Sequence, residues 1–237
     1  LPSVALVYDF DGTLAPGNMQ EFGLLQALGY DTLADFWNLC DQIAKTNDAG
    51  GIAVVMYAIQ AEAERAGIHC SREFLRSYGS HVQFFRGVEQ WFSLINEYAA
   101  QIGVEVKHYI NSSGIKEMIE GCSIAKEFEQ IYACTYLYDA KGDACWPAVV
   151  VDYTKKTQFL FKINEEIRYH VFRSILYFKM RIYSNFPFST RYHFQFRIIK
   201  HGILPIHRIL GFIKNRLDSL FQQKQFQHTD NIMRRTS

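Results

Sequence analysis

The sequence predicts an α/β protein with a parallel sheet, a group of helices inserted after the first strand, and a C-terminal third of a different character. Three observations lead to this prediction. An apolar strand over residues 4–8 ends at two carboxylates, residues 19–101 show helical periodicity, and a second apolar strand ends at Asn-Ser-Ser-Gly. Strands that are buried on both faces of a parallel sheet form continuous apolar runs, and residues 4–8 have this form.

The composition is that of an ordinary globular protein. Hydrophobic residues make up 49% and charged residues 21% of the 237 residues, which excludes collagen-like, coiled-coil and fully disordered classes. The five cysteines are scattered without a Cys-x-x-Cys pair, so we expect reduced thiols rather than a disulfide framework or a zinc site. The chain has no apolar run long enough to span a membrane and no basic secretory start, so we expect a cytoplasmic location. Leu1 in place of an initiating methionine is compatible with a fragment of a longer chain.

The last third of the chain differs from the rest in charge and composition. Residues 1–164 hold 12 Lys and Arg against 20 Asp and Glu, whereas residues 165–237 hold 13 against 4 and contain no alanine. We therefore place a boundary near residue 164. The expected parts are a core formed by residues 1–18 and 88–164, a helical cap over residues 19–87, and a basic, aromatic-rich tail over residues 165–237.

Two carboxylates follow the first strand. The apolar run VALVY stops at Asp9, which begins the string DFDGTL and is separated from Asp11 by one residue. Two acids so close repel each other unless one is protonated or a cation lies between them. Mg²⁺ prefers oxygen ligands. We therefore expect Asp9 and Asp11 to bind Mg²⁺ at the carboxyl end of the strand, where ligands bind in open α/β sheets.

The string DFDGTL after an apolar strand resembles the first motif of the haloacid dehalogenase (HAD) superfamily, most of whose members are Mg²⁺-dependent phosphatases. The resemblance implies a HAD-like Rossmannoid parallel sheet. It also implies that Asp9 is the nucleophile that forms an aspartyl-phosphate, and that Asp11 is the general acid and base. Because the dehalogenases of the superfamily lack the second aspartate, Asp11 favours phosphoryl chemistry.

The helical segment over residues 19–87 follows this first motif. In that position it is similar to the helical cap of the phosphoserine phosphatase-like branch of the superfamily. The resemblance implies that it closes over the site, excludes water and selects the substrate. For Arg72, Arg76 and Arg86 we favour surface solvation over contact with an anionic substrate.

The second and third motifs of the superfamily have counterparts further along the chain. The second strand, expected over residues 104–110, is followed by Ser112 and Ser113 before a helix, and the resemblance implies that Ser112 holds the phosphoryl oxygens, with Ser113 as the alternative. Residues 131–138 and 148–153 are expected to form a hairpin. A helix is then expected to begin at the lysine pair of residues 155 and 156. The resemblance implies that Lys156, or alternatively Lys155, balances the negative charge of the nucleophile and of the phosphoryl oxygens.

The fourth motif of the superfamily, an apolar strand that ends in Gly-Asp or Asp-Asp, is absent. After residue 164 the acids are Glu165, Glu166, Asp218 and Asp230, and none of them closes an apolar strand. Without this acid the site offers few oxygen ligands for Mg²⁺, which demands nearly octahedral oxygen geometry. The missing segment would also supply the fourth and fifth strands, so we expect one edge of the sheet to be uncovered.

Three explanations of residues 165–237 remain. In the first, the segment is a basic amphipathic element that binds an acidic surface such as RNA or a membrane. In the second it is a divergent domain, and in the third it is a translation of the wrong reading frame. We favour the last, because the change in composition coincides with the loss of the family pattern. For the core we expect a small phosphorylated metabolite as partner and no nucleic acid.

The function expected from these features is that of a Mg²⁺-dependent phosphomonoester hydrolase of the HAD type. The alternative is a catalytically impaired or inactive HAD remnant, or a binding protein, that keeps three motifs and lacks the fourth.

Overall fold

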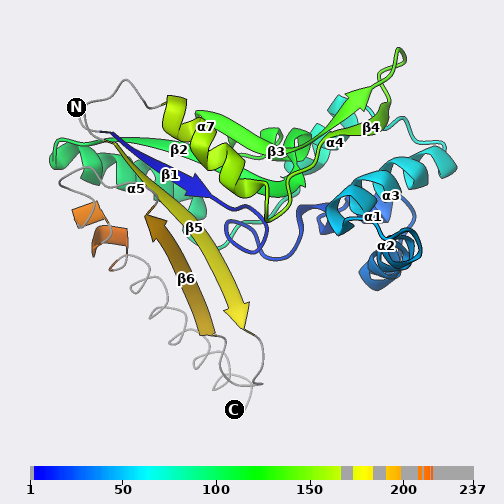
Figure 1. Cartoon of the computed structure of the whole chain (residues 1–237), viewed down its shortest axis with the longest axis horizontal. Coiled ribbons are helices and arrows are strands. Elements are labelled where there is room, and N and C mark those ends of the chain that lie inside the picture. The colour runs from blue at the N-terminus through cyan, green and yellow to red at the C-terminus, as the bar shows by residue number, and fades with distance from the viewer. Residues whose placement is uncertain are drawn as a thin grey trace, which may run out of the picture.

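The computed structural model describes residues 3–166, 173–183 and 191–198, and residues 208, 209, 211–213 and 215. These residues form a six-stranded sheet with the order β4-β3-β2-β1-β5-β6 (Figure 1). The four inner strands are parallel, and β4 and β6 pair antiparallel at the two edges. The strands are β1 (Ser3–Tyr8), β2 (Glu105–Ile115), β3 (Gln130–Tyr138), β4 (Ala144–Val149), β5 (Arg173–Tyr183) and β6 (Arg191–Ile198). The predicted α/β class with a parallel sheet is confirmed.

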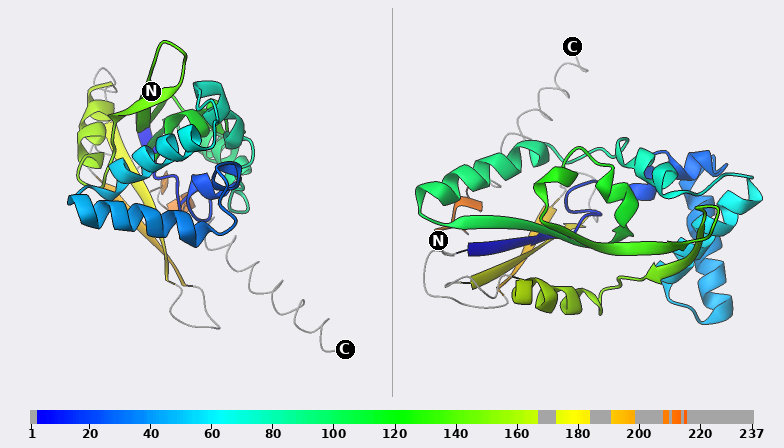
Figure 2. Two further views of the ribbon diagram at one scale, coloured as in Figure 1. Left: turned by 90° about the vertical axis from the view of Figure 1, so that its right-hand side faces the viewer. Right: turned by 90° about the horizontal axis from the view of Figure 1, so that it is seen from above.

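Helices cover both faces of the sheet. Helix α5 (Val88–Gln101) lies on one face and α7 (Lys156–Glu166) on the other (Figure 2). Strand β1 packs against the helices on both faces of the sheet, because its successive side chains point to opposite faces. Leu6 belongs to the large core that includes α5, whereas Val7 packs in a smaller cluster with Ile163 of α7. A strand buried in this way explains the continuous apolar run that the sequence shows.

The helical insertion predicted after the first strand is present. Its helices lie beyond the carboxyl end of β1, beside the hairpin of β3 and β4 (Figure 1). They are η1 (Met19–Glu21), α1 (Leu24–Ala27), α2 (Leu33–Asn47), α3 (Gly51–Arg65) and α4 (Arg72–Gly79). The chain then returns to the sheet through α5.

Close packing joins the insertion to the core. Helix α4 lies against α6 (Lys116–Glu120), and a Cβ atom on Gly121 would collide with the backbone carbonyl of Arg76. On the same interface, the guanidinium of Arg72 lies 3.1 Å from the buried carboxylate of Glu117, which also accepts a hydrogen bond of 2.9 Å from the hydroxyl of Tyr138. These contacts fix the insertion over the end of the sheet where β1 stops.

Two expectations about the strands need correction. The edge beside β1 is covered, because β5 pairs parallel with β1 and places Phe178 opposite Tyr8. The predicted hairpin is confirmed, but its second strand is β4 rather than residues 148–153. The reason is a tight turn in which the carboxylate of Asp139 accepts hydrogen bonds from the N–H groups of Lys141 and Asp143, so pairing resumes at once.

Part of the sequence interpretation falls on residues that the structure does not describe. Asp218 and Asp230 lie outside the described residues. Among the basic side chains of the tail, the described set includes only that of Arg208, which is exposed, so the expected binding of an acidic surface also lies outside it. In the described ranges no helix has the length and apolar character needed to cross a bilayer.

Candidate active site

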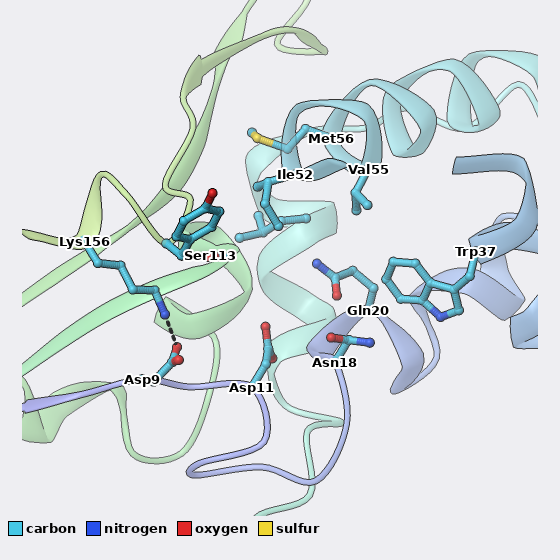
Figure 3. A pocket seen from close by; sticks show the side chains of 12 residues that line it. Asp9, Asp11, Asn18, Gln20, Trp37, Ile52, Val55, Met56, Ser113 and Lys156 are labelled. Carbon is cyan, nitrogen blue, oxygen red and sulfur yellow. Dashed lines mark ion pairs between the residues drawn. The ribbon is translucent and has the colours of Figure 1, made fainter. Parts of the chain in front are cut away.

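An ion pair joins the first and third motif candidates. Asp9 follows the last residue of β1 and is 7% exposed, and its Oδ1 accepts a hydrogen bond of 3.0 Å from the N–H of Phe10. The same oxygen lies 2.7 Å from Nζ of Lys156, the first residue of α7 (Figure 3). The neighbouring Lys155 is exposed and does not line the site. The fold therefore places a cation, whose side chain is 12% exposed, against the carboxylate that the sequence assigned as nucleophile.

Asp11 sits on the turn that follows β1. Gly12 permits this turn with a φ of +68°, and the N–H of Leu14 donates back to the carbonyl of Phe10 at 2.8 Å. Oδ1 of Asp11 accepts a hydrogen bond of 3.0 Å from the N–H of Met19. Burial and, to a smaller extent, the charge of Asp9 raise the pKa of Asp11 to about 7. A carboxyl group with such a pKa can both give and take a proton near neutral pH, as a general acid and base must.

Two residues that the sequence analysis missed hold the start of α7. Nδ2 of Asn111, inside β2 where its pairing with β3 shifts register, donates a hydrogen bond of 2.8 Å to the carbonyl oxygen of Lys156. The carboxylate of Asp152 accepts hydrogen bonds from the N–H groups of Thr154 and Lys155, both at 2.9 Å. The signal for Asp152 was present, since an aspartate two residues before a threonine is a typical turn and helix cap.

The two candidate serines have different surroundings. Ser112 is fully buried, and its Oγ accepts a hydrogen bond of 2.9 Å from the N–H of Gly114. Ser113 is half-buried and lines the same pocket as Asp9 and Asp11, whereas the side chain of Ser112 does not line it. A Cβ atom on Gly114 would collide with Met19 and lie 3.2 Å from Oδ2 of Asp11, so a glycine here lets β2 pass close to the second acid.

The pocket at these residues has a volume of about 230 Å³, below the roughly 300–1,000 Å³ of sites for drug-sized ligands. One end holds the four chemically active candidates Asp9, Asp11, Ser113 and Lys156. The opposite side comes from Asn18 and from the insertion, which contributes Gln20, Trp37, Ile52, Val55 and Met56 (Figure 3). None of the three arginines considered in the sequence analysis lines it.

The two acids fit Mg²⁺ in the type of their donor atoms. Both carboxylates line one pocket, and after burial, the larger cause, the charge of Asp9 also raises the pKa of Asp11. A divalent cation would relieve the repulsion between them. In the described part of the chain, however, no three His, Cys, Asp or Glu side chains gather to hold a metal. Beyond Phe178, the partner of Tyr8, the remaining residues of β5 are KMRIY without an acid.

Comparison with known proteins agrees with this geometry at the level of the fold. No protein-family model matches the chain. An uncharacterized protein of Borreliella burgdorferi is 28% identical over 189 residues, which cover 68% of this chain and 65% of that protein. A HAD family hydrolase of Salmonella enterica serovar Typhi superposes with a TM-score of 0.51 at 14% identity, over 71% of this chain and 53% of that one.

A phosphoserine phosphohydrolase-like protein of Francisella tularensis gives a TM-score of 0.42 at 15% identity, over 70% of this chain and 83% of that one. The fold of this chain is HAD-like, with a helical insertion after the first strand. The chain spans about two thirds of the length of the Borreliella protein and about half that of the Salmonella hydrolase.

Proposed function

We propose that this chain is a phosphomonoester hydrolase of the HAD type, acting on a small phosphorylated metabolite through an aspartyl-phosphate on Asp9. The ion pair between Asp9 and Lys156, 2.7 Å long and largely shielded from water at the carboxyl end of β1, is the observation that carries the proposal. It joins residues from distant parts of the sequence at the edge of the sheet where α/β proteins bind ligands.

In the proposed reaction, Asp9 is the nucleophile and Asp11 is the general acid and base. A carboxylate oxygen of Asp9 attacks phosphorus, the bond from phosphorus to the ester oxygen breaks, and Asp11 gives its proton to the departing alcohol. Asp11, now ionised, takes a proton from water, whose oxygen attacks the phosphorus of the aspartyl-phosphate. The bond from phosphorus to the Asp9 oxygen breaks, inorganic phosphate leaves, and Asp11 is protonated again.

Lys156 and a serine hydroxyl bind the phosphoryl oxygens in this scheme. Lys156 balances the charge of Asp9 before the attack and that of the phosphoryl group during it. For the hydroxyl, the sequence favours Ser112, whereas the pocket contains Ser113. Asp9 and Asp11 would hold Mg²⁺, which when bound supplies positive charge to the phosphoryl oxygens.

A second candidate function is that of a binding protein that retains the fold without turnover. It is favoured by the lack of a third metal-ligating side chain in the described ranges of the chain. Such a protein would bind a phosphate ester beside Lys156 and release it unchanged.

Hydrolysis of 4-nitrophenyl phosphate over a series of Mg²⁺ concentrations distinguishes the two functions. The hydrolase predicts turnover that requires Mg²⁺ and is lost in Asp9→Asn. Asp41→Asn, which alters an exposed aspartate of α2, is the matched control and should retain the activity. Turnover that survives Asp9→Asn would contradict the proposed mechanism, and its absence at every Mg²⁺ concentration would support the binding protein.

A further inference from the structure

Gln20 carries a buried hydrogen-bond acceptor that has no donor. The residue belongs to η1, lines the pocket and is 5% exposed. In the described part of the chain, its Oε1 accepts no hydrogen bond. Figure 3 shows its amide between the carboxylate of Asp11 and the indole ring of Trp37. Because a buried acceptor without a donor is unfavourable, a ligand that brings a donor to this atom gains affinity.

The neighbouring polar groups on this side of the pocket are already engaged. The indole N–H of Trp37 donates to Oε1 of Glu21 at 3.0 Å, and Nδ2 of Asn18 donates to the same oxygen at 2.8 Å. Glu21 itself does not line the pocket. These hydrogen bonds hold Trp37 and Asn18 in place, whereas Oε1 of Gln20 has no donor among the described residues and can accept a hydrogen bond from a ligand.

The rest of this side is apolar. Ile52, Val55 and Met56 of α3 face the pocket together with Trp37 of α2 (Figure 3). The charged residues among those that line the pocket are Asp9, Asp11 and Lys156, all at the reactive end. A charged group on this apolar side would lose its hydration without meeting an opposite charge, which is costly.

We propose that Gln20 is a specificity residue that accepts a hydrogen bond from a hydroxyl or N–H of an uncharged, partly apolar leaving group. This inference rests on the phosphatase function proposed above. It narrows the substrates to monophosphates of neutral alcohols that carry a donor. It disfavours the phosphates of free amino acids such as serine, because their ammonium and carboxylate groups are charged.

A panel of phosphate esters tests the inference. Phenyl phosphate offers an apolar leaving group without a donor, the three isomeric hydroxyphenyl phosphates add a donor in different positions, and phosphoserine offers a charged leaving group. In the wild-type protein, at least one hydroxyphenyl phosphate should exceed phenyl phosphate in kcat/KM by about tenfold. Phosphoserine should be the poorest substrate of the panel.

The variant Gln20→Met removes the acceptor and nearly preserves the shape of the side chain. It should lower kcat/KM for the preferred hydroxyphenyl phosphate by about tenfold more than for phenyl phosphate, chiefly through KM. Gln26→Met, at an exposed position of α1, is the matched control and should leave the preference intact. Equal losses on both esters, or a wild-type preference for phosphoserine, would overturn the inference.

Failure of the proposed function gives a different result from failure of the inference. If the wild-type protein hydrolyses no ester, the hydrolase is refuted, and the dissociation constants of the same panel, measured by calorimetry, decide the role of Gln20. Tighter binding of a hydroxyphenyl phosphate that is lost in Gln20→Met supports the role. Equal affinities across the panel, or no binding of any ester, overturn it.

Discussion

Asn111 and Lys156 are joined by a hydrogen bond of 2.8 Å, in which the amide Nδ2 of Asn111 donates to the carbonyl oxygen of Lys156. Strand β2 thereby holds the start of α7, and Nζ of Lys156 reaches the carboxylate of Asp9 from that position. Asn111 fixes the backbone at the start of α7 and Lys156 supplies the charge, so the two roles can be separated by mutation.

Lys156→Met should lower kcat/KM for phosphate ester hydrolysis by about 100-fold or more, because the variant loses the charge that faces Asp9 and the phosphoryl oxygens. Steady-state kinetics with 4-nitrophenyl phosphate measure the loss. Lys155→Met provides the control, since Lys155 is exposed and lies outside the pocket. Comparable losses in both variants would refute a specific role for Lys156.

The two serines make opposite predictions. If Ser113 binds the phosphoryl oxygens from its place in the pocket, Ser113→Ala should raise KM for the ester by about tenfold, the effect of one lost hydrogen bond to a charged group. Ser112→Ala should then act mainly on stability, because its Oγ accepts the N–H of Gly114. A larger kinetic effect in Ser112→Ala would instead assign the role to Ser112, as the sequence motif suggests.

The pKa of Asp11 predicts how the metal-free protein responds to pH. Burial and the charge of Asp9 raise it from 3.8 to about 7, so between these values the folded protein keeps a proton that the unfolded chain releases. The free energy of unfolding should therefore fall as the pH rises from about 4 to 7.

Urea denaturation in EDTA across this pH range measures the effect. Asp11→Asn should remove this part of the pH dependence. At pH 8 its free energy of unfolding should exceed that of the wild type by about 1–2 kcal/mol, less than the full pKa shift would give, because water screens part of the effect. The exposed Asp41→Asn should keep the slope. An unchanged slope in Asp11→Asn would show that Asp11 is not the group that titrates.

Gly121 sets the contact between the insertion and the core. Gly121→Ala should destabilise the protein by about 2 kcal/mol or more, because the new Cβ would collide with the backbone of α4 rather than with a flexible side chain. Gly51→Ala makes the same chemical change at the start of α3, where nothing lies within 4 Å of the new Cβ, and should be neutral or mildly stabilising. Thermal unfolding of the two variants gives the comparison.

The coding DNA tests the reading-frame hypothesis for residues 165–237. A Gly-Asp-x-x-x-Asp string is expected in one of the two other frames after codon 164. The structure is consistent with this hypothesis, because β5 occupies the position beside β1 but its residues after Phe178 include no acid. If neither frame encodes such a string, the basic tail belongs to the protein as it stands.

Local patterns in the sequence were enough to predict the acids and the strand that carries them. Asp9 and Asp11 belong to one short string after an apolar run, and Lys156 opens a helix in the expected order. Gln20 and Trp37 could not be predicted as pocket residues, because their position depends on how the insertion folds back over the sheet. The covered edge was missed although β5 carries an apolar run over residues 175–178, opposite residues 5–8 of β1. The reason is that the change in composition after residue 164 was interpreted as a change of reading frame.

Strand β1 is an inner strand of the finished sheet, flanked by β2 and β5, and both of these strands are synthesised after it. A nascent chain therefore leaves the ribosome with VALVY exposed, and it must wait for segments made much later before both sides of that strand are paired. Such long-range pairing is slow, and until it is complete the apolar side chains and the unpaired backbone of the strand are open to other molecules. Expression of this protein should accordingly benefit from chaperones and from slow translation at low temperature.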